Sequence, residues 1–424
     1  MPTRIIASIA VVTLTLLSGS NSPCLADNTA WSIDEVVRIA VAGHPLVSQV
    51  DAEILAAGAR KGQAESAYYP SVGIATGYTR YRSFNPVSHG SSTVNSEYLQ
   101  GTMSLTITDF GRTGAAVDRA DALLSSVKET GKSIRADVEF AAKAGYYNVL
   151  RAQRVLDVSR ETARQRESLL RQAQAYYGAG IRARIDVARA EANLFQARAE
   201  LTAAENDLQV ARITLLNRMG IESPRDFQLK DTLANETYPG TLEEWVKEAE
   251  AGRPELRAFL ERERAAEMAL RAARAGYRPI LTGTGGYGYA ADEFPLQENF
   301  NVTVQLSFPV FSGFITRQQV AETQAQLSAA RFAVTDYRRL VRLQVEQAAL
   351  AVRSSREQSD ARRKEREASG ENLRLATGRY EVGAGDIIEM IDAQVQMSRS
   401  DTQYIDTLYG YSVSVAALQR AIGK

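Results

Sequence analysis

The sequence contains very few of the residues from which catalytic and metal sites are usually built. Its 424 residues include one cysteine, Cys24, and two histidines, His44 and His89. A structural zinc site, a disulfide framework or a Cys–His catalytic centre needs more than this. The sequence also has no Gly-x-x-x-x-Gly-Lys-Ser/Thr run for a nucleotide and no Gly-x-Ser-x-Gly elbow for a hydrolase. These shortages favour a protein that is not an enzyme and that uses no cofactor or metal.

An excess of charge of either sign is also missing. Lys and Arg together number 50, as do Asp and Glu, which argues against a nucleic-acid partner. Beyond the N-terminal region there is no apolar run of about 18 residues, so no transmembrane helix is expected.

Residues 1–26 are interpreted as a secretory signal peptide. Arg4 supplies the charged start, and an apolar stretch too short to span a bilayer follows it. Cys24-Leu25-Ala26 then offers small residues for cleavage before Asp27. A lipoprotein signal that acylates Cys24 is the alternative, although Pro23 fits such a signal poorly.

One short pattern occurs in each half of the chain. Tyr177-Gly178-Ala179-Gly180 and Tyr380-Glu381-Val382-Gly383 each interrupt a long segment with helical periodicity. Glycine takes the left-handed conformation that ends a helix at little cost, so each glycine predicts a reversal of the chain. His44-Pro45 likewise matches Arg253-Pro254. We therefore expect a duplicated structure, with a first repeat at 27–220, a connector at 221–251 and a second repeat at 252–424.

Long helices are predicted over about 113–177 and 314–380. Neither range contains proline, and apolar residues recur every seven positions, as in a coiled coil. A helix of that length is a rod of roughly 100 Å, so the molecule must be elongated. Shorter helices are expected over about 46–68, 183–219 and 386–422.

Four segments change to a period of two and predict β-strands, at about 71–82, 98–109, 280–289 and 299–311. In the last, Phe300, Val302 and Val304 alternate with Asn301 and Thr303. His89 falls in the loop expected between the first two strands.

Each predicted strand has one apolar and one hydroxylated face. In a soluble protein the apolar faces would need a cover, whereas lipid covers the outside of a transmembrane β-barrel. Four strands cannot close a barrel around a pore, so several chains would have to share one. The alternative is a soluble cap of two hairpins on a helical rod.

The chain resembles the TolC-like outer-membrane efflux protein (OEP) family. The resemblance rests on the secretory start, the two repeats, the strands that begin after Pro70 and Pro279, and the paired Tyr-x-x-Gly reversals. It implies a homotrimer in the outer membrane of a Gram-negative bacterium. There, twelve strands form one barrel in the outer-membrane lipid, the helices form a hollow barrel through the periplasm, and the connector surrounds its middle.

The resemblance also implies the function. Family members are passive exit ducts of tripartite efflux or type I secretion systems, and they meet a periplasmic membrane-fusion adaptor and an inner-membrane pump of the RND or ABC type. A periplasmic adaptor or coiled-coil scaffold is the competing reading of the long helical hairpins. The sequence does not indicate the cargo.

By the same resemblance, the two reversals close the duct at its periplasmic tip. The family's gate carboxylates fall on Glu389 and Asp392, the acid that accepts a link falls on Asp186, and the linking tyrosine falls on Tyr380. Tyr177, Gly180 and Gly383 mark the reversals that would contact the adaptor. The alternative is that the charges are ordinary solvated residues.

One departure from the family pattern concerns the linking arginine of the second repeat, because Gly385 occupies its position. Arg182, Arg184 and Arg189 lie on the first-repeat side instead. The hypothesis is that one of them pairs with Glu389 or Asp392.

Overall fold

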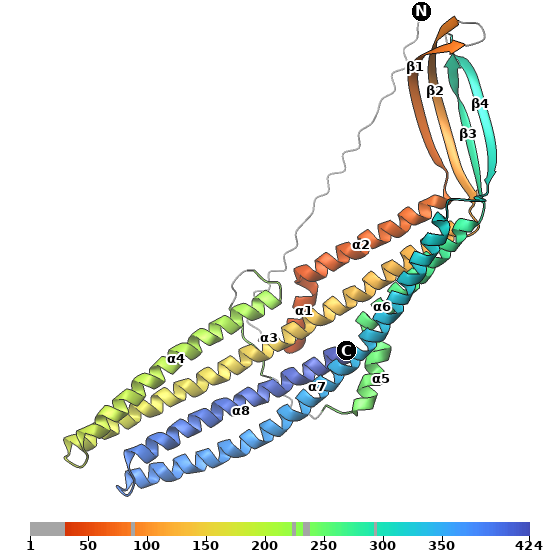
Figure 1. The fold of residues 1–424 in the computed structure, drawn as a ribbon. Coiled ribbons are helices and arrows are strands. Elements are labelled where there is room, and N and C mark those ends of the chain that lie inside the picture. The colour runs from red at the N-terminus through yellow and green to blue at the C-terminus, as the bar shows by residue number, and fades with distance from the viewer. Residues whose placement is uncertain (1–29, 86–89, 223–225, 232–237, 292–294) are drawn as a thin grey trace, which may run out of the picture.

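The chain forms an elongated helical body with a small β-sheet at one end (Figure 1). A computed structural model describes residues 30–424 except 86–89, 223–225, 232–237 and 292–294. The predicted signal peptide, Cys24 and His89 lie outside the described residues. Among the described residues, no helix is both long enough and apolar enough to cross a membrane.

The two halves of the chain repeat the same order of elements. The first half contains α1 (Ile33–Gly43), α2 (Pro45–Glu65), β1 (Ser71–Asn85), β2 (Gly90–Thr108), α3 (Arg112–Gly178) and α4 (Arg184–Arg218). The second contains α5 (Leu242–Gly252), α6 (Pro254–Arg274), β3 (Ile280–Ala291), β4 (Gln297–Ser307), α7 (Ile315–Glu381) and α8 (Ile387–Ile422). Short 3₁₀ turns, Ser66–Tyr68 and Ala275–Tyr277, precede β1 and β3.

Local signals explain where the helices begin. Ser32 and Glu35 form a capping box at the start of α1, and Thr241 and Glu244 form one at the start of α5. A proline occupies the first turn of α2 and of α6, where its missing N–H costs nothing.

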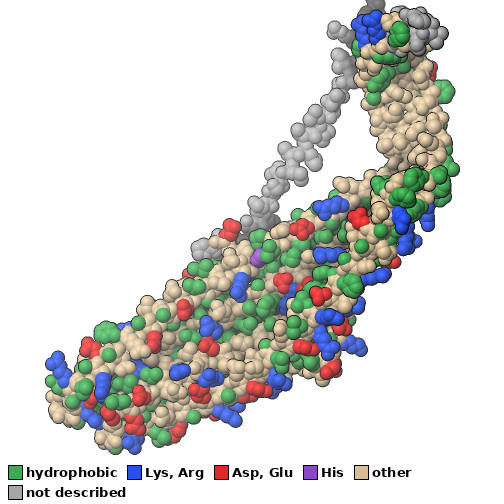
Figure 2. Space-filling view, in the orientation of Figure 1, with side chains coloured by type: hydrophobic (Ala, Val, Ile, Leu, Met, Phe, Trp, Pro, Cys, Tyr) green, Lys and Arg blue, Asp and Glu red, His purple; other side chains and the backbone are tan. Residues whose placement is uncertain are grey.

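The four strands form one antiparallel sheet in the order β1-β2-β3-β4. Its register places apolar residues of β1, β2 and β4 on one face, as the row Val72, Met103 and Val302 illustrates, with Gly285 of β3 between the last two. Within the described part of the chain no helix covers this face, and Val72 and Val302 are exposed. On the face visible in Figure 2, charged side chains are spread along the helices, whereas the middle of the sheet shows none.

The strands differ from the predicted ranges at their ends. β2 begins at Gly90 rather than near 98, because the Ser- and Asn-rich segment that was expected to be a loop pairs with the far half of β1. β4 ends at Ser307 rather than at 311, since Pro309 has no N–H to donate to a neighbouring strand.

The largest apolar cluster lies midway along the helical body, where α1, α3, α4 and α8 meet the connector. Trp31 stacks on Phe227 at 5.1 Å between ring centroids. The backbone N–H of Trp31 donates to Gln228, and the N–H of Lys230 donates back to Trp31. The N-terminal segment and the connector are therefore joined at the middle of the rod, far from both ends.

Candidate functional site: the paired helix reversals

The reversal between α3 and α4 lies beside the reversal between α7 and α8, at the end of the molecule opposite the sheet (Figure 1). We call these two reversals and the helical turns next to them the tip. Two reversals from different halves of the sequence thus meet in a single chain.

Both reversals have the same backbone geometry. Gly180 has φ +71° and Gly383 has φ +76°, which is the left-handed region that favours glycine. The N–H of Ile181 donates to the carbonyl of Tyr176, and the N–H of Ala384 donates to that of Arg379. Together with the bonds from the glycine N–H groups to Tyr177 and Tyr380, these define a Schellman motif in each copy. Glycine is favoured at these two positions because of the positive φ. Steric crowding is not the reason, since a Cβ at either glycine would meet nothing within 4 Å.

Tyr380 is the centre of an apolar cluster that joins the two hairpins. Its side chain is only 1% exposed, although it lies within a turn of the end of α7. The cluster takes residues from all four helices of the tip: Leu169, Ala173, Ala190, Tyr380, Ile387, Met390 and Ile391. The ring of Tyr176 lies 6.1 Å from that of Tyr380, in a tilted arrangement. Closing the two hairpins on each other therefore buries this ring.

The hydroxyl of Tyr380 has no hydrogen-bond partner among the described residues. Burial raises the pKa of Tyr380, and the negative charge of Asp186 raises it further. Asp186 is itself buried in the first turn of α4. The sequence expectation of a link between Tyr380 and Asp186 thus takes a different form in the single chain, because the contact across the hairpins is made by the ring.

Arg182 connects the two reversals directly. Its Nη2 donates to the backbone carbonyl of Gly385 at 3.0 Å, and its guanidinium lies 5.4 Å from the centroid of the Tyr380 ring. Position 385 is also sterically restricted, since a Cβ there would lie 3.0–3.1 Å from Arg379 and the backbone nitrogen of Tyr380. A side chain at the family's arginine position would therefore require the turn to shift by a few tenths of an ångström, whereas Arg182 contacts residue 385 from the other repeat.

The hypothesised pairing of a first-repeat arginine with Glu389 is not the one found here, and Asp392 forms no ion pair among the described residues. The Oε1 atom of Glu389 lies 3.3 Å from Nε of Arg379, which belongs to the same repeat. Both side chains of that ion pair are about half exposed, so solvent screens it strongly.

The remaining predicted residues lie on the surface of the tip. Glu389 and Asp392 are exposed near the start of α8, and Arg184 is exposed at the start of α4. Arg189 is partly buried, and Tyr177 is exposed beside its glycine.

Sequence reasoning missed two residues of the tip, Arg379 and Tyr176. Both immediately precede a tyrosine of the Tyr-x-x-Gly pattern. A comparison that extended before these tyrosines, as well as after the glycines, would have included them.

The sequence and the fold were each found to be similar to those of known outer membrane proteins. A family model described as "Outer membrane efflux protein" matches residues 36–220 and 245–424. Outer membrane protein OprJ of Pseudomonas aeruginosa is 25% identical over 324 residues, which are 74% of this chain and 67% of that protein. Outer membrane protein TolC of Escherichia coli is 23% identical over 427 residues, covering 96% and 84%. The solved open state of the MtrE outer membrane channel of Neisseria gonorrhoeae matches with a TM-score of 0.80 at 19% identity, covering 92% of this chain and 88% of that one.

Proposed function

Because the chain belongs to the outer membrane efflux protein family, we propose that its tip is the gate of an exit duct. The protein is an outer-membrane efflux channel that extends into the periplasm. In the proposal it provides a passive route from a periplasmic adaptor and an RND or ABC pump to the exterior, and the pump supplies the energy. One observation carries this function. An uncovered sheet with one apolar face lies at one end of the elongated molecule, and two helix reversals that pack against each other lie at the other end.

The duct is proposed to be a homotrimer. Two features of one chain support this assembly. β1 and β4 are the outer strands of the sheet and have no partner on their far sides among the described strands, and such open edges are not tolerated in lipid. Large apolar side chains also remain exposed on the outer helices of the rod, on α7 (Phe332, Leu343, Leu350) and on α4 (Phe195, Ile213). Three copies of the four-stranded sheet would make a closed barrel of twelve strands.

The gate is proposed to combine packing and charge. The ring of Tyr380 and the bond from Arg182 to Gly385 hold the two hairpins of one chain together. Glu389 and Asp392 provide carboxylates that are exposed at the constriction and attract cations. Contact between the adaptor and the two reversals, near Tyr177, Gly180 and Gly383, would move the hairpins apart.

Cell fractionation and bilayer recording test the duct itself. A duct is expected in the outer-membrane fraction as a heat-resistant oligomer, and the purified protein is expected to form discrete conductance steps in a planar bilayer. A periplasmic adaptor or scaffold is expected to be extracted without detergent and to form no steps. That second result would exclude the proposed function.

The charged part of the gate has its own test. Replacing both carboxylates, Glu389→Ala with Asp392→Ala, is expected to raise single-channel conductance and to weaken block by multivalent cations, because fewer charges bind cations at the constriction. Glu371→Ala is the matched control, since Glu371 is an exposed carboxylate paired with Arg374 on its own helix. Unchanged conductance and unchanged block in the double variant would remove these two residues from the gate.

A further inference from the structure

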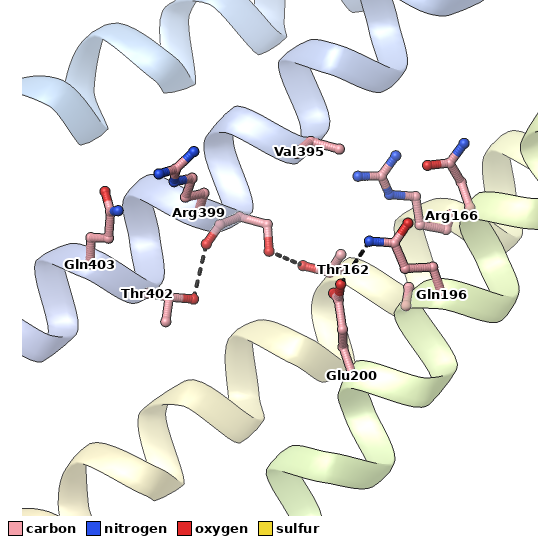
Figure 3. Close-up of a pocket in the computed structure, with 11 residues that line it drawn as sticks. Thr162, Arg166, Gln196, Glu200, Val395, Arg399, Thr402 and Gln403 are labelled. Carbon is pink, nitrogen blue, oxygen red and sulfur yellow. Dashed lines mark hydrogen bonds between the residues drawn. The ribbon is translucent and has the colours of Figure 1, made fainter.

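A cavity lined mainly by polar residues lies between the two hairpins (Figure 3). Its volume is about 280 Å³, and its walls come from α3, α4 and α8. It is separate from the cluster around Tyr380 and contains none of the predicted gate residues. Figure 3 shows the side chain of Arg166 reaching from α3 into the space between Gln196 of α4 and Val395 of α8.

Arg166 is a buried cation without a counter-charge in contact. It is 4% exposed, and it takes part in no ion pair among the described residues. Its Nη1 atom is buried and has no hydrogen-bond partner among those residues. Arg253, which is buried to a similar degree, has Glu255 at 3.2 Å. Since buried charges are normally paired, the exception at Arg166 calls for a ligand.

The nearest candidate within the chain, Glu200, does not provide that pairing. Glu200 lines the same cavity, but its Oε1 atom accepts a hydrogen bond from Nε2 of Gln196 at 3.0 Å. Burial lowers the pKa of Arg166, while the charge of Glu200 acts in the opposite direction, and the two side chains form no ion pair. The cavity is therefore lined by a buried cation whose Nη1 atom has no hydrogen-bond partner among the described residues.

We propose that this cavity binds a small oxyanion on Arg166. A guanidinium offers parallel N–H donors whose spacing matches two oxygens of a carboxylate, phosphate or sulfate. The volume is several times that of one water molecule, which is about 30 Å³. The wall formed by α8 is polar, because it includes Ser398 and Gln403, and the Ser398 hydroxyl accepts a hydrogen bond at 3.1 Å from Thr162, which lies one turn before Arg166 on α3.

Binding at this place would act on the contact between the hairpins. Arg166 belongs to the first hairpin, whereas Ser398 and Gln403 belong to the second. An anion held between them adds contacts that exist only while α8 lies against α3. A higher anion concentration would therefore favour the arrangement in which the two hairpins lie together. The site does not include Glu389 or Asp392.

The test is binding of inorganic phosphate to the detergent-extracted full-length protein, measured by isothermal titration at constant ionic strength set with chloride. The wild type is expected to bind saturably. Arg166→Gln is expected to weaken binding at least tenfold, because the charged fork is lost. Arg164→Gln is the matched control, since Arg164 on the same helix is 72% exposed and pairs with Glu161. Glu200→Gln is expected to tighten binding several-fold, because it removes the competing negative charge.

Further arms decide the remaining outcomes. Sulfate and succinate, titrated in the same way, are expected to compete with phosphate, which identifies the shared oxyanion chemistry. If Arg166→Gln does not assemble, Arg166→Lys keeps the charge but loses the fork, and it is expected to bind phosphate more weakly than the wild type. Absence of saturable binding in the wild type, or equal binding by wild type and Arg166→Gln, would overturn the proposal. Bilayer conductance of the same samples separates these outcomes from a failure of the duct, since a conducting protein that ignores phosphate refutes only the anion site.

Discussion

Two substitutions of Tyr380 show whether its aromatic ring or its hydroxyl keeps the two hairpins of the tip together. Tyr380→Phe keeps the ring and removes an oxygen that has no hydrogen-bond partner among the described residues. Tyr380→Ala removes the ring from the cluster of Leu169, Ala190 and Met390. Replacing a buried aromatic residue by alanine costs about 3 kcal/mol or more, whereas deleting an unpaired hydroxyl is nearly neutral.

The affected equilibrium is local, because the cluster is confined to the ends of α3 and α7 and the starts of α4 and α8. A loss of about 3 kcal/mol corresponds to a shift of roughly 100-fold in the ratio of closed to open tips. We therefore expect Tyr380→Ala channels in planar bilayers to spend much more time in a high-conductance state, and Tyr380→Phe channels to resemble the wild type.

The alternative is a hydrogen bond from Tyr380 to Asp186, made in the assembled protein but not in the single chain. In that case Tyr380→Phe and Asp186→Asn would each open the channel, and the double variant would open it no further. Such a result would refute the assignment to ring packing.

Three further predictions concern other parts of the tip and the rod. Gly383→Ala is expected to destabilise the tip by about 1–2 kcal/mol, because residue 383 has a positive φ. Gly378→Ala is expected to stabilise the tip slightly, because residue 378 lies within α7 and a Cβ there would meet nothing within 4 Å. Limited proteolysis at the reversals measures both effects. Arg420→Met is expected to lower the free energy of unfolding by about 3–5 kcal/mol, because Arg420 is largely buried and pairs with Glu255 and Asp137. Arg342→Met is the control: its ion pair is exposed, so the loss in thermal unfolding is expected to be less than about 1 kcal/mol. Burial raises the pKa of Tyr380, so the closed tip favours the neutral tyrosine. Raising the pH is therefore expected to open the tip only above about 10, the ordinary tyrosine pKa. Tyr380→Phe is expected to abolish this alkaline transition in conductance.

The features that could be predicted from the sequence are those that local chemistry dictates. Gly180 and Gly383 end helices because of their φ values, and Ser32 begins one through its capping box. The alternation in Phe300, Val302 and Val304 predicted a strand with one apolar face, and the register places that face with those of the other strands.

The features that escaped prediction depend on residues far apart in the sequence. The segment after Gly90 has the composition of a loop and becomes a strand only because β1 lies beside it. The partner of Glu389 is Arg379, which the turn itself brings close. The isolation of Arg166 is visible only when α3, α4 and α8 surround it, since nothing in its sequence neighbourhood distinguishes it from the exposed Arg164.

The bond from Arg182 to Gly385 gives the tip a fastening that proton concentration cannot loosen. Its acceptor is a main-chain carbonyl, which carries no titratable proton and which no side-chain substitution can delete. Its donor is a guanidinium, which stays charged at every physiological pH. The half-exposed ion pair between Arg379 and Glu389 on the same tip is screened by salt, so the two contacts respond to different conditions. Separating the hairpins by this route requires a mechanical displacement of one reversal from the other.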